Sequence, residues 1–227
     1  MNKARLLLRK YHIWLGWLIA LPFLFWALSG LIMVMKPIEE VRGTHLLGEA
    51  PKLPSGLAVV PPRIGPRPVE SILLEQRGDG PKWIVRYADG NARLADAATG
   101  RLLPPLSAPQ AVSVLKARYA GKAEIIAVDR TAADNPPLDL RRPMETWRIS
   151  MSDGTRFYVS TATGEIVARR TAFWRFYDLM WGLHIMDLKT RENTNNPLVI
   201  GFGIAALIAT ILAILLLPMT IRRRRRA

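Results

Sequence analysis

Three histidines, His12, His45 and His184, are the residues of this 227-residue chain whose side chains could transfer a proton near neutral pH or bind a metal through an imidazole nitrogen. The chain has no cysteine, which excludes disulfides, thiolate nucleophiles and cysteine-ligated metals. The HExxH, GxSxG, Walker A and dinucleotide-binding motifs are all missing, and no acidic pair is placed for acid–base work. The sequence therefore predicts no catalytic residue and no metal site, and the histidines must be judged by the segments that carry them.

Two long apolar runs lie near the ends of the chain. Residues 13–35 carry no charge, and residues 197–218 form a second uncharged run that ends at Pro218. About 20 apolar residues cross a hydrocarbon core of about 30 Å, so both runs predict transmembrane helices. A signal peptide is the alternative for the first run. Its apolar part would be about 7–15 residues long and would end in a small-residue cleavage site. This run is longer and lacks such a site, so we expect an uncleaved signal anchor.

The charges indicate how the two spans are oriented. All 18 Asp and Glu lie between Glu39 and Glu192, and this stretch also carries 22 Lys and Arg, a net charge of +4. The other ten cations of the +14 chain lie in residues 3–10, at Lys36 and in residues 222–226. Because positive charge favours the cytoplasmic side, residues 1–12 and 219–227 are predicted to be cytoplasmic and the middle periplasmic, in a bacterial inner membrane. Cations that flank apolar runs also argue against a nucleic-acid partner.

The second span carries small residues at every fourth position, Gly201, Ala205, Ala209 and Ala213. On a helix they form one stripe, and such stripes let helix backbones approach closely in lipid. One interpretation is a packing face, either against the first span or across a homodimer. The other is that Ala and Gly are simply common in transmembrane helices.

The middle of the chain contains an internal repeat. Three short motifs recur at one constant offset, the separation between Trp83 and Trp147. They are Trp83–Arg86 with Trp147–Ser150, Asp89-Gly90 with Asp153-Gly154, and Ala98–Gly100 with Ala162–Gly164. Each copy is interpreted as a strand, an Asp-Gly hairpin turn, a second strand and a Thr-Gly turn. A duplicated unit of this size is a small domain rather than a solenoid repeat.

The remaining patterns complete the predicted fold. Residues 36–68 are rich in Pro and Gly and are interpreted as a linker, residues 108–119 predict an amphipathic helix, and residues 124–128 could be a strand. The two units are placed at residues 69–130 and 131–170, and an interfacial aromatic helix and loop at 171–196. Because a unit of about 64 residues is marginal alone, we expect one compact α+β domain between two transmembrane helices.

The motifs of the repeat resemble the PepSY module: a Trp-bearing strand, an Asp-Gly hairpin, and an Ala-Thr-Gly strand end. Tyr11–Gly16 and Trp181–His184, beside the two spans, resemble the PepSY-associated transmembrane helix family. The resemblance covers roughly residues 10–30 and 70–218. Larger members have about four spans, so this chain resembles a minimal two-span member. Some members are inner-membrane haem-b reductases that act on ferric siderophores, whereas soluble PepSY modules act as inhibitory or chaperoning segments.

The resemblance implies that the histidines could be haem-b ligands. His12 and His184 match histidines of the family, but the predicted topology places them on opposite sides of the membrane. The first span, residues 13–35, is about 34 Å long as a helix, so one monomer cannot place both on one haem. His45 with His184, or His12 with its copy in a dimer, are the pairs that could. The alternative, three interfacial histidines with structural hydrogen bonds, is favoured, because neither span has an internal histidine.

The segment from Thr171 to Leu188 is predicted to be a helix with many aromatic residues. Trp174, Tyr177 and Trp181, together with Arg175, could form a platform for haem, a siderophore or a lipid. The favoured interpretation is an amphipathic helix in the lipid headgroup layer, where aromatic residues are enriched.

Two functions follow from these patterns. The first is a non-catalytic periplasmic binding or regulatory module, anchored by two spans that pack on a membrane-protein partner. The second, which depends on the resemblance, is a haem-b electron-transfer or ferric-siderophore reductase subunit in iron uptake.

Overall fold

The computed structural model describes residues 3–224, so residues 1–2 and 225–227 of the predicted cytoplasmic tails lie outside the described part. The chain divides into two compact units. We call residues 3–37 and 176–224 the helical unit, and residues 38–175 the sheet unit. The predicted arrangement, two apolar helices on either side of an α+β region with antiparallel sheets, is confirmed at this level.

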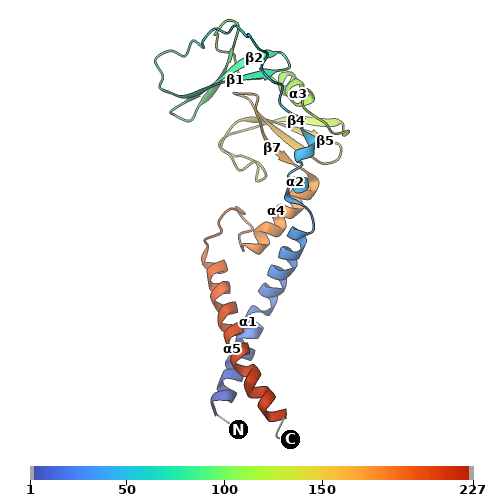
Figure 1. Cartoon of the computed structure of the whole chain (residues 1–227), viewed down its shortest axis with the longest axis vertical. Helices are drawn as coiled ribbons and strands as arrows, with labels where there is room; N and C mark the ends of the chain where they lie inside the picture. Colours follow the sequence, from blue (N-terminus) through green and yellow to red (C-terminus); the bar gives the residue numbers. More distant parts are fainter. Residues whose placement is uncertain (1–2, 225–227) are drawn as a thin grey trace. The chain divides into compact units, whose positions relative to one another are not determined.

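The helical unit contains α1 (Lys3–Val34), α5 (Pro197–Arg224) and most of α4 (Ala172–His184). Both α1 and α5 are long and apolar enough to span a membrane, and they lie side by side in Figure 1. Only 6% of the apolar window of each helix is buried, whereas the core helix of a water-soluble domain would be covered. Most of their large apolar side chains are therefore exposed on the surface of the helical unit.

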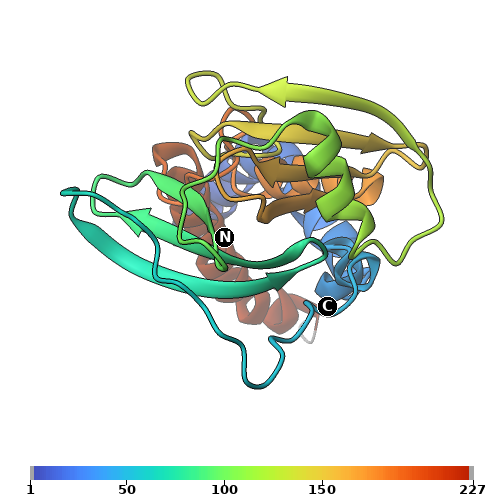
Figure 2. The ribbon, with the colours of Figure 1, turned by 90° about the horizontal axis from the view of Figure 1, so that it is seen from above.

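The sheet unit contains two antiparallel sheets, seen side by side in Figure 2. The first consists of β1 (Val69–Arg77), β2 (Gly80–Tyr87) and β3 (Ala92–Asp96). The second consists of β4 (Ile125–Thr131), β5 (Thr146–Met151), β6 (Arg156–Ser160) and β7 (Ile166–Arg170). Short helical elements are α2 (Ile38–Val41), the 3₁₀ helix η1 (Thr44–Leu46) and α3 (Ala108–Lys116). The two copies of the repeat thus form two separate sheets within one compact unit.

The same pattern of hydrogen bonds occurs once in each sheet. The tryptophans and hairpin carbonyls that take part are separated by the offset of the sequence repeat. The indole N–H of Trp83 donates to the Val60 carbonyl at 2.8 Å, and that of Trp147 donates to the Leu106 carbonyl at 2.7 Å. The amide N–H groups of Val60 and Leu106 in turn donate to the carbonyls of Ala97 and Thr161, which are equivalent positions of the two copies. Each repeated tryptophan therefore ties an extended segment, from outside the sequence repeat, to its own hairpin.

The first strand of each sheet is also equivalent, although the sequence motifs do not reveal it. Val69 pairs with Tyr87 and Ile125 pairs with Met151, and a register shift follows directly in both β1 and β4. The offset between β1 and β4 is shorter than the offset of the motifs, because residues 78–79 join β1 to β2 whereas the longer segment 132–145 joins β4 to β5. The second copy therefore begins earlier than predicted, since the 130/131 boundary falls inside β4.

The second sheet is covered on both faces. On one face, α3 packs Ala111 and Leu115 against Ile149, Phe157 and their neighbours. On the other face, the connection 132–145 places Leu140 against Tyr158. The sequence predicted α3 as a longer helix, 108–119, and the structure ends it at Lys116. Both faces of this sheet thus contribute to the core of the sheet unit.

Candidate functional site

His184 is held against the first apolar helix inside the helical unit. Its imidazole stacks on the Trp26 ring at a centroid distance of 4.7 Å. Its Nδ1 lies 3.1 Å from the Trp26 carbonyl oxygen and 3.1 Å from Oγ of the fully buried Ser29. Gly30 permits this approach, since a Cβ there would lie 3.2 Å from Cε1 of His184. The last residue of α4 is therefore locked onto residues 26–30 of α1.

The hydrogen bonds define which ring nitrogen of His184 is available. The Trp26 carbonyl can only accept, and the Ser29 hydroxyl already donates to it at 2.9 Å. We therefore assign a hydrogen to Nδ1, and in the neutral imidazole this assignment leaves the Nε2 lone pair free. Within the described residues, Nε2 has no hydrogen-bond partner. A histidine oriented through Nδ1 in this way is suited to ligate iron through Nε2.

The other two histidines lie elsewhere. His12 precedes Trp26 on α1 by about 21 Å at the helical rise of about 1.5 Å per residue. Its Nδ1 is buried and has no hydrogen-bond partner among residues 3–224. His45 is exposed on η1 of the sheet unit. Within the described residues, no group of three His, Asp or Glu side chains could hold a metal ion.

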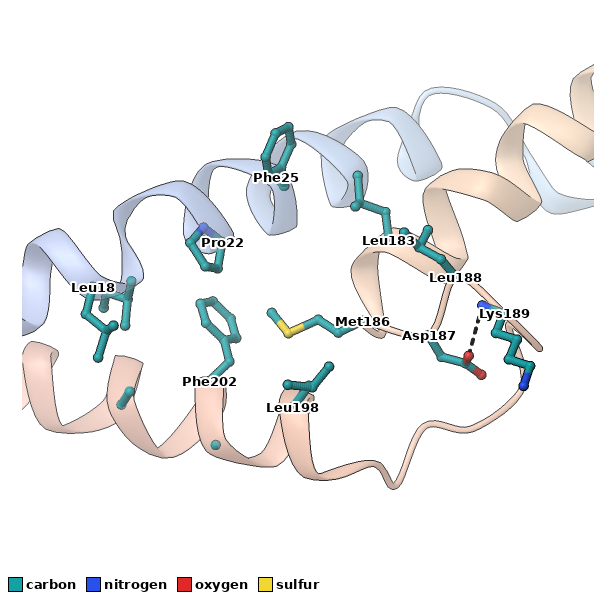
Figure 3. Close-up of a pocket in the computed structure, with 13 residues that line it drawn as sticks. Leu18, Pro22, Phe25, Leu183, Met186, Asp187, Leu188, Lys189, Leu198 and Phe202 are labelled. Atoms are coloured by element: carbon teal, nitrogen blue, oxygen red, sulfur yellow. Dashed lines mark hydrogen bonds between the residues drawn. The ribbon is translucent and has the colours of Figure 1, made fainter.

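An apolar groove of about 710 Å³ lies between α1 and α5 (Figure 3). Phe202 of α5 points toward Pro22 of α1, and the Met186 side chain extends into the space between the helices. Gly201 and Ala205 of the predicted stripe line this groove. A Cβ added to Gly201 would meet no described atom within 4 Å. Ala209 is buried and Ala213 is half-buried. The first two residues of the stripe therefore line the open groove, and the last two are partly or fully covered.

One end of the groove is formed by the loop after α4. The Asp187 carboxylate accepts hydrogen bonds from the amides of Lys189, Thr190, Glu192 and Asn193 and from the Thr190 hydroxyl. These bonds, the Thr190 hydroxyl first, hold the pKa of Asp187 well below its usual value. The helix ends at His184 rather than at the predicted Leu188, because Met186 takes a left-handed φ of 56° and begins this loop.

The residues of the predicted aromatic platform are divided between the two units. In the sheet unit, the Trp174 ring lies 4.1 Å from the guanidinium of Arg170, and Arg175 donates to the Gly154 carbonyl at 2.7 Å. In the helical unit, Tyr177 is half-buried, and Trp181 donates to the Arg191 carbonyl at 3.1 Å. Trp174, Arg175 and Trp181 therefore all make contacts within their own units. Their role in ligand binding stays a prediction.

Sequence reasoning missed the partners of His184. Ser29 is the one hydroxyl residue in the apolar run 13–35, and Trp26 lies deeper in that run than an interfacial anchor should. A lone polar residue beside a deep tryptophan was the available signal. This signal does not identify the partner, because the sequence pattern does not show which distant side chain contacts Ser29 and Trp26.

Comparisons of the chain with protein-family models, with curated proteins and with solved structures find no match. The resemblance to the PepSY-associated family therefore stays a prediction that rests on the motifs alone.

Proposed function

We propose that this chain is an accessory protein of the bacterial inner membrane. In this proposal the sheet unit is a periplasmic, non-catalytic binding or regulatory module of the PepSY type. The helical unit anchors it through two spans and packs on a membrane-protein partner or on a second copy. The observation that carries the proposal is the open apolar groove between α1 and α5.

The groove has the properties of a helix-packing site. Its walls on α1 and α5 are apolar, and the small residues Gly201 and Ala205 form part of its surface on α5. In lipid, helices associate through close van der Waals packing, and small residues permit the closest approach. The strongly exposed Leu198, at 69%, lies at the same groove and would be covered by a partner helix. Within residues 3–224, no other helix covers this surface.

The basic chain ends support the proposed topology. Ten of the 32 cations flank the two apolar runs, residues 13–35 and 197–218, and both ends of the chain are basic. Under the positive-inside rule this favours cytoplasmic termini and a periplasmic sheet unit.

Affinity purification of the full chain from native membranes in mild detergent tests the proposal. We expect either a second membrane protein in fixed ratio or a dimer of the chain. Gly201→Leu should remove that association, because the leucine would occupy the groove. Gly203→Leu is the matched control: Gly203 is also open, with no described atom near an added Cβ, but it does not line the groove. A monomer without a partner, in the wild type, would contradict the proposal.

A second candidate, a haem-b electron-transfer subunit, is favoured by one observation. The Nδ1 bonds of His184 leave its Nε2 free to bind iron. The residues fit one axial ligand but not a bis-histidine site within the helical unit, because His12 lies about 21 Å along α1 from Trp26. When bound, haem would supply one-electron transfer.

An absorption spectrum of the detergent-purified chain, expressed with adequate haem, tests this second candidate. A Soret band that His184→Ala removes would support it, and His45→Ala would show whether His45 is the second ligand. His12→Ala would then show whether His12 supplies a ligand from a second copy. The lack of any Soret band would exclude the candidate.

A further inference from the structure

A second cavity, of about 420 Å³, lies entirely within the sheet unit. Its lining comes from four places: Ala50, Pro51 and Leu53; the end of β1 with Gly78; the end of α3 with the residues after it; and the turn before β7 with the start of that strand. The volume is within the range of about 300–1,000 Å³ that small-molecule sites occupy. Nothing in the proposed packing of the helical unit uses this cavity.

Arg77, the last residue of β1, is the unusual feature of the lining. Its side chain is only 10% exposed, and Nε and Nη1 are buried without a hydrogen-bond partner among the described residues. Nη2 lies 3.2 Å from the Glu75 carboxylate, which is itself 37% exposed. A buried guanidinium with unmatched N–H groups is costly, and such groups are normally satisfied.

The fold brings Arg77 close to the Thr-Gly turn of the second copy. A Cβ at Gly164 would overlap Nη1 of Arg77, so glycine at this position leaves the guanidinium its present place. Gly164 also has a left-handed φ of 65°, which favours glycine independently. The turn that recurs in the sequence therefore also forms a wall for the arginine.

The other charged groups of the cavity add a positive bias. Arg118 donates to the Gly48 carbonyl through Nη2, and its Nε is buried without a partner in the described structure. The Glu165 carboxylate is occupied by Arg86 at 2.6 Å and by the Thr163 hydroxyl at 2.8 Å. Burial, and then the charge of Arg118, lower the pKa of nearby Arg169. Among residues 3–224, Glu75 is therefore the lining carboxylate that Arg77 engages.

We propose that this cavity binds a small organic carboxylate with an apolar body, which pairs with the planar fork of Arg77. Arg binds carboxylates through two parallel hydrogen bonds, which a compact anion or a neutral group does not match as well. Leu53, Val114 and Ile166 supply apolar wall for the rest of the molecule.

Binding is an exchange in this site. The half-exposed Glu75 carboxylate now occupies Nη2 of Arg77, and it can turn to solvent when another carboxylate arrives. Glu75 thus competes with the ligand for the same guanidinium. The inference rests on the proposed binding role of the sheet unit, and it specifies the chemistry of the ligand.

Titration of the full detergent-solubilised chain with N-acetyl-leucine, followed by calorimetry, tests the inference. Its uncharged amide and inorganic phosphate serve as parallel probes. We expect N-acetyl-leucine to bind at least about tenfold more tightly than either probe, as the loss of a charge-assisted hydrogen bond implies. Arg77→Lys should weaken binding by at least about tenfold, because lysine lacks the fork. Glu75→Gln should tighten it, which a purely structural Arg77–Glu75 pair would not do.

Arg130→Gln is the matched control. Arg130 also forms an ion pair, with Glu145, but it does not line the cavity, so binding should be unchanged. The inference would be overturned if the amide or phosphate bound as tightly as N-acetyl-leucine. It would also be overturned if N-acetyl-leucine bound neither the wild type nor Glu75→Gln. If the same preparations still retain their membrane-protein partner or remain dimeric, only the carboxylate inference fails. If the chain is also a monomer without a partner, the proposed function fails with it.

Discussion

At the scale of single residues, Gly30 determines how closely His184 approaches α1. The added Cβ of a larger residue would lie 3.2 Å from the imidazole, tighter than ordinary van der Waals contact. We predict that Gly30→Val moves the ring and destabilises the helical unit by about 1–3 kcal/mol, a typical cost of overpacking. Side-chain ¹⁵N shifts of His184 should then lose the signature of the Nδ1–H tautomer. Gly16→Val, at an open position on α1, is the control and should change neither measurement.

Asp187 makes the loop that closes the groove sensitive to acid. Its lowered pKa means that the loop is fully stabilised above the ordinary Asp pKa of 3.8 and loses this stabilisation as the pH falls through the lowered value. Hydrogen exchange of the amides at 189–193 should therefore show protection near neutral pH that fades in strong acid. Asp187→Asn should remove that protection at neutral pH, whereas Asp153→Asn, in the sheet unit, should not. Unchanged protection in Asp187→Asn would contradict this role of the carboxylate.

At the scale of elements, the hydrogen bonds of the two repeated tryptophans hold segments that the strands alone would leave loose. Trp147→Phe removes the bond to the Leu106 carbonyl, and we predict a loss of about 1 kcal/mol in the free energy of unfolding of the sheet unit. Trp83→Phe should cost less, because its bond to Val60 is exposed to water. Chemical denaturation measures both. Trp17→Phe, on the exposed side of α1, should leave this transition unchanged.

The sequence predicted the elements that carry a local pattern. The two apolar helices, the repeated hairpins and α3 were all expected, because apolar runs, Asp-Gly turns and helical periodicity are visible without tertiary information. The first strands β1 and β4 were harder to place, since the offset between them is shorter than the offset of the repeated motifs. A motif search at one fixed offset cannot find a strand whose spacing is changed by a loop of different length.

The candidate sites were less predictable than the fold. His184 was identified as a chemically capable residue, but its partners Trp26 and Ser29 lie near the other end of the sequence. Arg77 is one of 32 cations and follows no motif. Its importance comes from its burial and its unmatched N–H groups, and both arise only when the two copies of the repeat are folded together.

At the scale of the whole molecule, the absence of cysteine makes the proposed topology directly testable. Single cysteines can be introduced at Ala4, before the first apolar run, and at Ser55, in the exposed linker of the sheet unit. We predict that a membrane-impermeant maleimide labels Ser55→Cys but not Ala4→Cys when the outer membrane alone is opened. The parent chain is the unlabelled control, and lysis should make both positions reactive. Labelling of Ala4→Cys before lysis would reverse the assigned orientation.

The unequal connections in the two sheets have a practical consequence. Residues 78–79 join β1 to β2, whereas the much longer segment 132–145 joins β4 to β5, and both pairs of strands are antiparallel with a register shift at the same place. The second sheet thus shows that this pair of antiparallel strands forms even when a longer segment connects them. A reporter peptide or a fluorescent tag could accordingly be spliced in between Asp134 and Asn135, away from both chain ends.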